Sequence, residues 1–187
     1  GFLKVLPTAD LEWQKFDTKK RKLFSPAEFE MVCATALTAS KNGEQLADYL
    51  RLLAYSGARR NEGLALKWTE VDFDRKQITI GADGFAKSRK PRTVDMTPAL
   101  EAHLRDMFSR RAPDSHWIFP SPQRGDKDLC SHGFVESLKL ARALLPPSLR
   151  WFSFHDARHY FISYAVMSGV PIMTIASWVG HADGGLL

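Results

Sequence analysis

Short stretches of this sequence place basic side chains and histidines where they could act on a phosphate. Arg59 lies in "YSGARRNEGLALKW", just after a predicted helix end at Gly57. An arginine on a turn held in this way can present two N–H groups to one phosphate. Taken alone, the more ordinary interpretation is that Arg59 and Arg60 are surface charges with Glu62 as an ion-pair partner.

A second stretch, "FSFHDARHYF", combines a helix start with a histidine and an arginine. Ser153 and Asp156 have the spacing of a capping box. His155 and Arg158 are three residues apart, so they share a face in the first turns, where backbone N–H groups and the helix dipole favour an anion. The pair therefore predicts a phosphate site, although the spacing does not separate His155 from His159. The alternative is a helix with assorted polar residues.

Two further signals are a lysine between predicted strands and a Gly-His pair. Lys87 lies in "GFAKSRKPRTVDM", where the tip of a hairpin could carry a long side chain into a neighbouring cleft. His181 follows Gly180 at the predicted end of a helix, where a lone histidine is usually a capping or surface residue. For the lysine stretch, the alternative is a solvated basic loop made of Lys87, Arg89, Lys90 and Arg92.

Other chemistries find no support in the sequence. No His/Cys/Asp/Glu cluster has metal-ligand spacing, and we expect no metal and no cofactor. Neither of the glycine-rich nucleotide motifs occurs, and G-x-S-x-G is absent. Arginines, histidines and a lysine instead suit the stabilisation of a phosphoryl transition state without a metal.

Composition indicates one folded domain with a mild excess of positive charge. The 187 residues are 44% hydrophobic and carry a net charge of +5, which favours a polyanion such as nucleic acid or an anionic membrane. Cys33 and Cys130 form no disulfide framework, so a reducing compartment is expected. No run approaches the ~20 apolar residues of a membrane span. Because the first residue is glycine, we expect a fragment or a processed product.

The elements that must position these side chains are mostly helices. Capping residues and apolar periodicity predict helices over 26–38, 43–56, 61–66, 98–111, 130–144, 154–169 and 171–179. "VDFD", "QITI" and "RTVDM" predict a small antiparallel sheet across 71–96, and 113–128 is expected to be a loop. Residues 1–22 are interpreted as a linker or arm.

The order of the signals is more specific than any one of them. The series Arg59, Lys87, His155-x-x-Arg158 and Gly180-His181 resembles the catalytic domain of tyrosine recombinases, the phage integrase family. "SPAEFEMVCATA", "SGARRNEGLALKWTEVDFDRKQITI", "AKSRKPRTVDMTPAL" and "FHDARHYFISYAVMSGVPIMTIASWVGH" extend the resemblance over roughly 22–181. It implies a mainly α (α+β) fold, a helical catalytic domain over 23–187 with a small three-stranded antiparallel sheet.

The resemblance also implies a mechanism and its residues. A tyrosine hydroxyl attacks a DNA phosphodiester, forms a 3′-phosphotyrosyl link and frees a 5′-hydroxyl, without metal or ATP. Arg59 and Arg158 would hold the non-bridging oxygens, and Lys87 would protonate the leaving oxygen. His155 would help to move the tyrosine proton or bond the phosphate, and His181 would donate a hydrogen bond to the phosphate.

The expected partner is double-stranded DNA, in the cytoplasm of a bacterial or phage-infected cell, during integration of a mobile element. The full-length protein would form a tetramer on DNA, and no membrane is involved. Residues expected to contact DNA are Lys19, Lys20, Arg21, Lys22, Arg60, Arg89 and Lys90. The run at 19–22 is equally well explained as a solvated basic stretch.

The nucleophile of the family is expected a few positions beyond Leu187. The tyrosines of this chain, Tyr49, Tyr55, Tyr160 and Tyr164, do not stand at that place. We therefore expect the chain alone to be inactive in DNA cleavage. The alternatives are a catalytically dead DNA-binding remnant, or activity with a tyrosine supplied in trans. A type IB topoisomerase, which shares the chemistry, fits the text around Arg59 less well.

Overall fold

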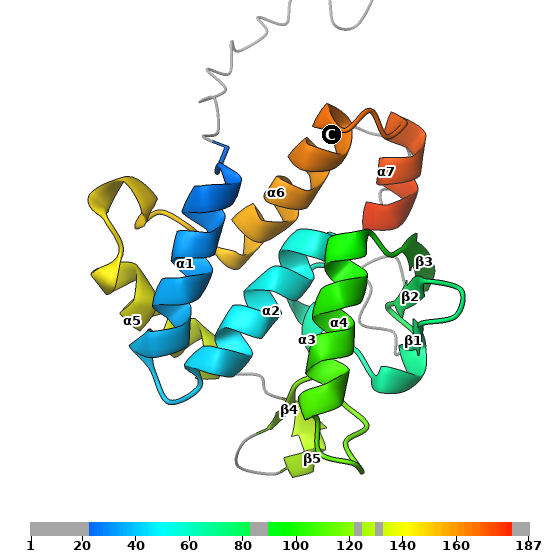
Figure 1. Ribbon diagram of the computed structural model, residues 1–187, viewed down its shortest axis with the longest axis horizontal. Helices are drawn as coiled ribbons and strands as arrows, with labels where there is room; N and C mark the ends of the chain where they lie inside the picture. Colours follow the sequence, from blue (N-terminus) through cyan, green and yellow to red (C-terminus); the bar gives the residue numbers. More distant parts are fainter. Residues whose placement is uncertain (1–22, 83–89, 122–124, 130–132, 181–187) are drawn as a thin grey trace, which may run out of the picture.

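Helices make up most of the fold, and α2 lies near its centre (Figure 1). The computed structural model describes residues 23–82, 90–121, 125–129 and 133–180. Within these ranges, no helix has the length and apolar character needed to cross a membrane. The helices are α1 (Pro26–Ala39), α2 (Gly43–Ser56), α3 (Arg60–Leu64), α4 (Pro98–Arg110), α5 (Gly133–Leu144), α6 (Phe154–Met167) and α7 (Ile172–Val179).

The central helix α2 is buried on nearly every side. The apolar face expected from the sequence, which includes Leu46, Tyr49 and Leu53, is fully buried. Leu52 and Ala54 are buried as well, because α1, α4, α5 and α6 all pack against this helix. Each large apolar side chain that leaves water here stabilises the fold by about 1.5–3 kcal/mol. The helix is thus the scaffold from which the following turn projects.

Capping residues set the starts of three helices as the sequence predicted. At α1, the Ser25 N–H donates to Glu28 Oε2 at 2.9 Å, and Ser25 Oγ accepts the Glu28 N–H at 3.2 Å. At α6, the Ser153 N–H and hydroxyl donate to Asp156 Oδ2 at 2.9 and 2.5 Å. The Thr97 hydroxyl caps α4. A cap of this kind is worth about 1 kcal/mol.

The predicted three-stranded antiparallel sheet is confirmed. It consists of β1 (Val71–Asp72), β2 (Gln77–Ile80) and β3 (Arg92–Asp95), in the order β1-β2-β3. Ile78 pairs with Val94, and Ile80 pairs with Arg92. Ile78, Ile80 and Val94 are fully buried, so this face of the sheet joins the core.

The prediction of a plain loop over 113–128 is wrong. The segment contains β4 (Pro120–Ser121), which pairs antiparallel with β5 (Gly125–Leu129). The stretch is polar and has no apolar alternation, so strand pairing left no signal in the sequence. Two 3-10 turns also escaped prediction, η1 (Trp68–Glu70) and η2 (Pro147–Leu149). The linker or arm proposed for 1–22 lies outside the described residues.

The last helix, α7, is attached through a small core of its own. Ile175 and Val179 pack with Phe161 of α6 in a cluster separate from the main core. Gly180 ends the helix in the left-handed conformation, with φ +68°, as the sequence predicted. This docking brings the carbonyl groups at the end of α7 next to the turn that follows α2.

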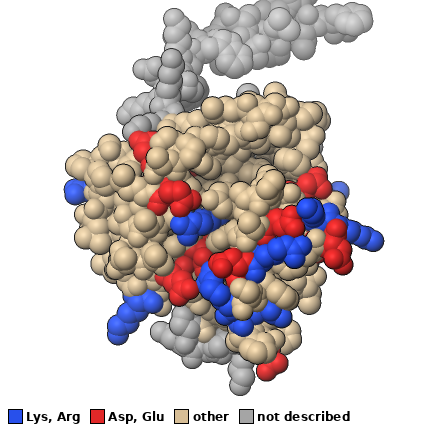
Figure 2. Space-filling view, viewed as in Figure 1, with Lys and Arg blue, Asp and Glu red and all other residues tan. Residues whose placement is uncertain are grey.

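The face around α2 and α4 carries alternating charges (Figure 2). Arg110 pairs with Glu44 at 2.8 Å and with Asp106 at 2.8 Å, and Arg51 pairs with Glu30 at 2.8 Å. Positive and negative groups therefore balance one another here. The excess charge of the chain does not form a continuous basic surface on this side.

Candidate functional site

Arg158 is a charged side chain in the interior. It is 3% exposed, and its Nη1 and Nη2 donate to the carbonyl oxygens of Gly57 and Val179 at 2.6 and 2.7 Å. Burial, followed by the charges of Arg59 and Arg92, lowers the pKa of Arg158 to about 10. The group still carries its proton at neutral pH. A guanidinium has five N–H donors, so donors remain for a ligand.

Arg59 is held by the turn between α2 and α3. Gly57 ends α2 with φ +67°, a conformation that suits glycine, and Arg59 follows in an extended conformation as the N-cap of α3. Its side chain is 30% exposed. Nη1 donates to Glu62 Oε1 at 3.0 Å, and Nη2 donates to the Gly180 carbonyl at 3.3 Å. The guanidinium is thus fixed between α3 and the end of α7.

Glu62 is the carboxylate that these arginines share. Its side chain is 1% exposed and also accepts the Arg59 backbone N–H at 2.9 Å and Arg92 Nη2 at 2.6 Å. Burial by itself would raise the pKa of Glu62. The hydrogen bonds from Arg92 and from the Arg59 backbone, with the charge of Arg92, outweigh burial and hold this pKa below its ordinary value. Glu62 is therefore ionised at neutral pH.

Arg92 is not part of a solvated loop, so that interpretation is wrong for this residue. Its side chain is 8% exposed, and Nε donates to the Trp178 carbonyl at 2.6 Å. Arg92 and Val94 are two residues apart on β3 and so lie on the same face, which is the buried one. Strand alternation could have revealed this, but the surrounding basic residues masked the pattern.

An open cleft of about 390 Å³ lies beside this cluster. It is lined by Ala58, Arg59, Arg60, Ser153, Phe154, His155 and Arg158. Among the described residues His159 does not line it, although the His155 and His159 rings touch edge to face with centroids 4.3 Å apart. The geometry thus favours His155 over His159, a choice that the spacing left open.

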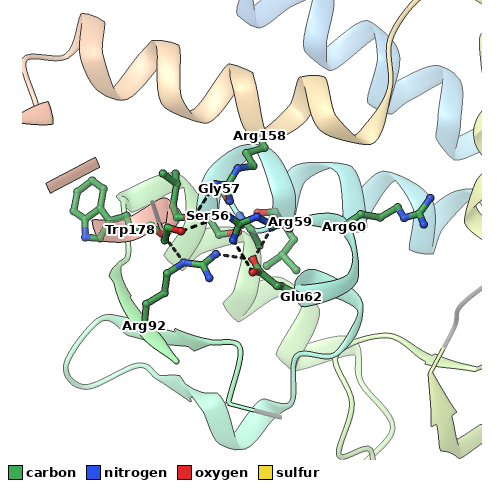
Figure 3. A network of polar contacts seen from close by, with 12 residues as sticks. Ser56, Gly57, Arg59, Arg60, Glu62, Arg92, Arg158 and Trp178 are labelled. Carbon is green, nitrogen blue, oxygen red and sulfur yellow. Dashed lines mark hydrogen bonds and ion pairs between the residues drawn. The ribbon is translucent and has the colours of Figure 1, made fainter. Parts of the chain in front are cut away.

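Figure 3 shows which of the expected residues come together. Arg59 and Arg158 converge with Arg92 around Glu62 and the carbonyls at the end of α7. Arg60 points away, is exposed and donates to Asn61 Oδ1 at 3.3 Å. Lys90 is exposed at the edge of the segment before β3. The remaining candidates lie outside the described residues: Lys19, Lys20, Arg21, Lys22, Lys87, Arg89 and His181.

The tyrosines of the chain lie elsewhere. No tyrosine is among the described residues that line the cleft. Tyr160 stacks on Phe29, and burial raises its pKa to about 12, which disfavours the phenolate that attack requires. The other three hydroxyls donate to neighbouring groups: Tyr49 to the Arg60 carbonyl, Tyr55 to the exposed carboxylate of Glu30 and Tyr164 to the Phe24 carbonyl.

The cluster is suited to binding an anion. Arg59 and Arg92 pair with the single carboxylate of Glu62, and the charge of Arg158 acts on the same cluster, so the positive charges are in excess. The arginines are fixed by protein hydrogen bonds, and such preorganised donors stabilise charge that develops on a phosphoryl group. Within the described ranges, no group of three or more His, Cys, Asp or Glu side chains could hold a metal ion.

Comparison with known proteins gives consistent results. The model of the "Phage integrase family" matches residues 9–186. The chain is 28% identical over 150 residues to the prophage integrase IntF of Escherichia coli (strain K12), covering 79% of this chain and 30% of that protein. It spans less than half of the length of the curated relatives that it matches.

Solved structures share the fold. The catalytic domain of bacteriophage HP1 integrase superposes with a TM-score of 0.58 at 22% identity, covering 87% of this chain and 82% of that one. The Tn1549 transposon integrase, in complex with a circular intermediate DNA, superposes with a TM-score of 0.67 at 15% identity, covering 90% of this chain and 60% of that one.

Proposed function

Because this chain belongs to the phage integrase family, we propose that its domain cleaves and rejoins double-stranded DNA at a specific site. The observation that carries the proposal is the convergence of Arg59 and Arg158 on one cleft. They come from segments far apart in the sequence, and both bond the carbonyls at the end of α7. Integration of a mobile element is the process that this activity serves.

In this proposal Arg59 and Arg158 hold the two non-bridging oxygens of the scissile phosphate. Their carbonyl and carboxylate bonds fix the guanidinium groups before DNA arrives, so little reorganisation accompanies the transition state. Losing one such donor typically lowers the rate by about 10²–10³-fold. Substitution of either arginine should therefore reduce cleavage far more than DNA binding, because many other phosphate contacts contribute to the binding affinity.

Lys87, His155 and His181 are assigned the proton transfers and a further hydrogen bond to the phosphate. A tyrosine oxygen forms a bond to phosphorus, and the bond from phosphorus to the 5′-oxygen breaks. Lys87 supplies the proton to the leaving oxygen, and His155 takes the tyrosine proton or bonds the phosphate. His181 donates a hydrogen bond to the phosphate. The phosphotyrosyl link retains the bond energy for rejoining, so neither metal nor ATP is required.

We place the nucleophile outside the 187 residues. Three of the tyrosine hydroxyls are engaged in hydrogen bonds, and Tyr160 stacks on Phe29. None of the four tyrosines is among the described residues that line the cleft. The attacking tyrosine then comes from sequence that follows Leu187 or from a partner subunit of a DNA-bound tetramer. Arg60 and Lys90 are proposed to contact DNA, together with Lys19, Lys20, Arg21, Lys22 and Arg89.

The test is trapping of a covalent complex on a nicked duplex that carries the element's attachment site. The protein is prepared as Gly1–Leu187 and as the product continued through whatever its gene encodes after Leu187. A covalent adduct is expected for the continued product only, and Arg59→Ala or Arg158→Ala should abolish it while binding at low salt persists. An adduct that survives both substitutions would overturn the assigned roles.

A second candidate is a DNA-binding remnant without catalysis, favoured because no tyrosine is among the described residues that line the cleft. It predicts binding whose affinity falls steeply with salt, by a slope of about 0.9 per phosphate contact on logarithmic axes, and no adduct from any product of the gene. The remnant would be the correct assignment if the gene encodes no tyrosine after Leu187 and if no covalent adduct forms when a partner subunit supplies the tyrosine.

A further inference from the structure

We propose that Arg92 is a positioning residue for DNA cleavage. It joins the start of β3 to Glu62 and to the end of α7, and through them it fixes the Arg59 guanidinium and the Val179 carbonyl that accepts from Arg158 (Figure 3). The inference rests on the proposed function, because it concerns the residues assigned to the phosphate. It adds a residue that the sequence patterns did not assign to the site.

The bonds of Arg92 connect the separate segments of the site. Nη2 donates to Glu62 Oε2 at 2.6 Å, and the same carboxylate accepts both the backbone and side-chain N–H of Arg59. Nε donates to the Trp178 carbonyl at 2.6 Å, one residue before Val179, whose carbonyl accepts Arg158. A displacement of Arg92 is therefore transmitted to both arginines at once.

Gly180 gives independent evidence that this contact is close. A Cβ at Gly180 would lie 3.2 Å from Arg92 Cδ and 3.3 Å from its Nε and Nη1. The glycine therefore leaves room for the guanidinium directly beneath the chain that leads to His181. Arg92 Nη1 is buried, and the described residues offer it no hydrogen-bond acceptor. A guanidinium held this tightly with an unused donor is placed to hold its neighbours in position.

Arg92 acts through other residues, because it does not touch the substrate cleft. Among the described residues it is not part of the cleft lining, whereas Arg59 and Arg158 are. Its charge still reaches Arg158, whose pKa it helps to lower. Arg92 also starts β3, the strand that follows the segment with Lys87. One side chain thus couples the two arginines to the base of that segment.

The test compares Arg92→Met and Arg92→Lys with a control, Arg51→Met. Arg51 also donates to a carboxylate, Glu30, but neither residue is among the described residues that line the cleft. The first measurement is ¹⁵N NMR of the arginine side-chain N–H signals of Arg59 and Arg158 in the 187-residue chain. The second is single-turnover cleavage and DNA affinity of the product that forms the covalent adduct.

We expect Arg92→Met to shift or broaden both arginine signals and to slow cleavage by about 100-fold, the scale of a 1 Å misplacement, with DNA affinity nearly unchanged. Arg92→Lys should recover part of the rate, because an ammonium can still pair with Glu62. Arg51→Met should leave the arginine signals and the cleavage rate as in the wild type, even if it lowers the melting temperature as much as Arg92→Met does.

Unchanged Arg59 and Arg158 signals in Arg92→Met would overturn the proposal. An equal loss of cleavage rate in Arg51→Met and Arg92→Met, when both are destabilised to the same extent, would also overturn it. If Arg92→Met does not fold, Arg92→Lys carries the comparison alone, and wild-type signals and rate would count against the role. Should the wild type fail to cleave DNA, the proposed function fails, but the NMR comparison still decides whether Arg92 positions the two arginines.

Discussion

Replacing Glu62 by glutamine tests whether one buried carboxylate holds the arginine cluster together. Glutamine keeps the shape but removes the charge that Arg59 and Arg92 share. Removing one partner of a buried ion pair costs about 3–5 kcal/mol. Arg92 would be left buried and charged, whereas the 30% exposed Arg59 can turn toward water, so we expect the lower end of that range.

The expected loss is therefore about 3 kcal/mol of unfolding free energy at pH 7. In a chain of this length, each kcal/mol lowers the melting temperature by about 2–4 °C, which gives a fall of roughly 6–12 °C. The measurement is urea and thermal unfolding of both proteins. The control is Glu136→Gln, which removes an exposed pair with Lys139 and should change stability by less than about 0.5 kcal/mol.

The pH dependence gives the same prediction a second test. The pKa of Glu62 is lower in the folded protein than in the unfolded chain. Its contribution is therefore fully present above the unfolded pKa of about 4.3 and is lost as the pH falls through the folded value. The stability difference between wild type and Glu62→Gln should be largest at pH 7 and should shrink below about pH 4. The reasoning would be refuted if the two proteins were equally stable at pH 7, or if their stability difference were the same at pH 7 and below about pH 4.

Three further predictions concern single positions. Gly57→Ala should lower the free energy of unfolding by about 3 kcal/mol, because the new Cβ would lie 2.4 Å from the Phe161 ring. Gly169→Ala, also at positive φ but with no atom within 4 Å of the new Cβ, should lower it by only about 1 kcal/mol. Equal losses in urea unfolding of the two variants would refute the steric argument. Arg158→Met should destabilise by roughly 2–4 kcal/mol by leaving two buried carbonyls without a donor, and stability within about 0.5 kcal/mol of wild type would contradict those bonds. Cys33 should resist alkylation at pH 8 in the folded protein, because burial raises the pKa of its thiol to about 12; rapid labelling found by peptide mass spectrometry would contradict the burial.

Most of the fold could be predicted from local sequence patterns. Helix starts could be predicted because a capping side chain accepts hydrogen bonds from backbone N–H groups within three residues. The capping residues are therefore visible in the sequence, here as Ser25, Thr97 and Ser153. Gly57 and Gly180 likewise record helix ends. The pairing of β4 with β5 left no such record, because it depends on where the chain turns back and not on apolar periodicity.

The site could be predicted only in part. The residue types and their order predicted that Arg59 and Arg158 would belong together, and both line one cleft. Spacing could not choose between His155 and His159, since the choice depends on how α6 is rotated against the turn after α2. The alternation along β3 could have placed Arg92 on the buried face, but its bond to the end of α7, a helix distant in sequence, could not be predicted.

The docking of α7 has a consequence for how the protein opens. Three long-range bonds that fix the two arginines join residues 121, 101 and 21 positions apart, and all three run to the end of α7 or to the turn after α2. Yet α7 has only eight residues, and its buried Ile175 and Val179 belong to a small core of their own, although Trp178 also packs against the cluster around α2. Helices of this kind detach in local unfolding events that leave the main core intact. Hydrogen exchange should therefore be faster in α7 than in α2, and each detachment takes one carbonyl acceptor from Arg59 and one from Arg158.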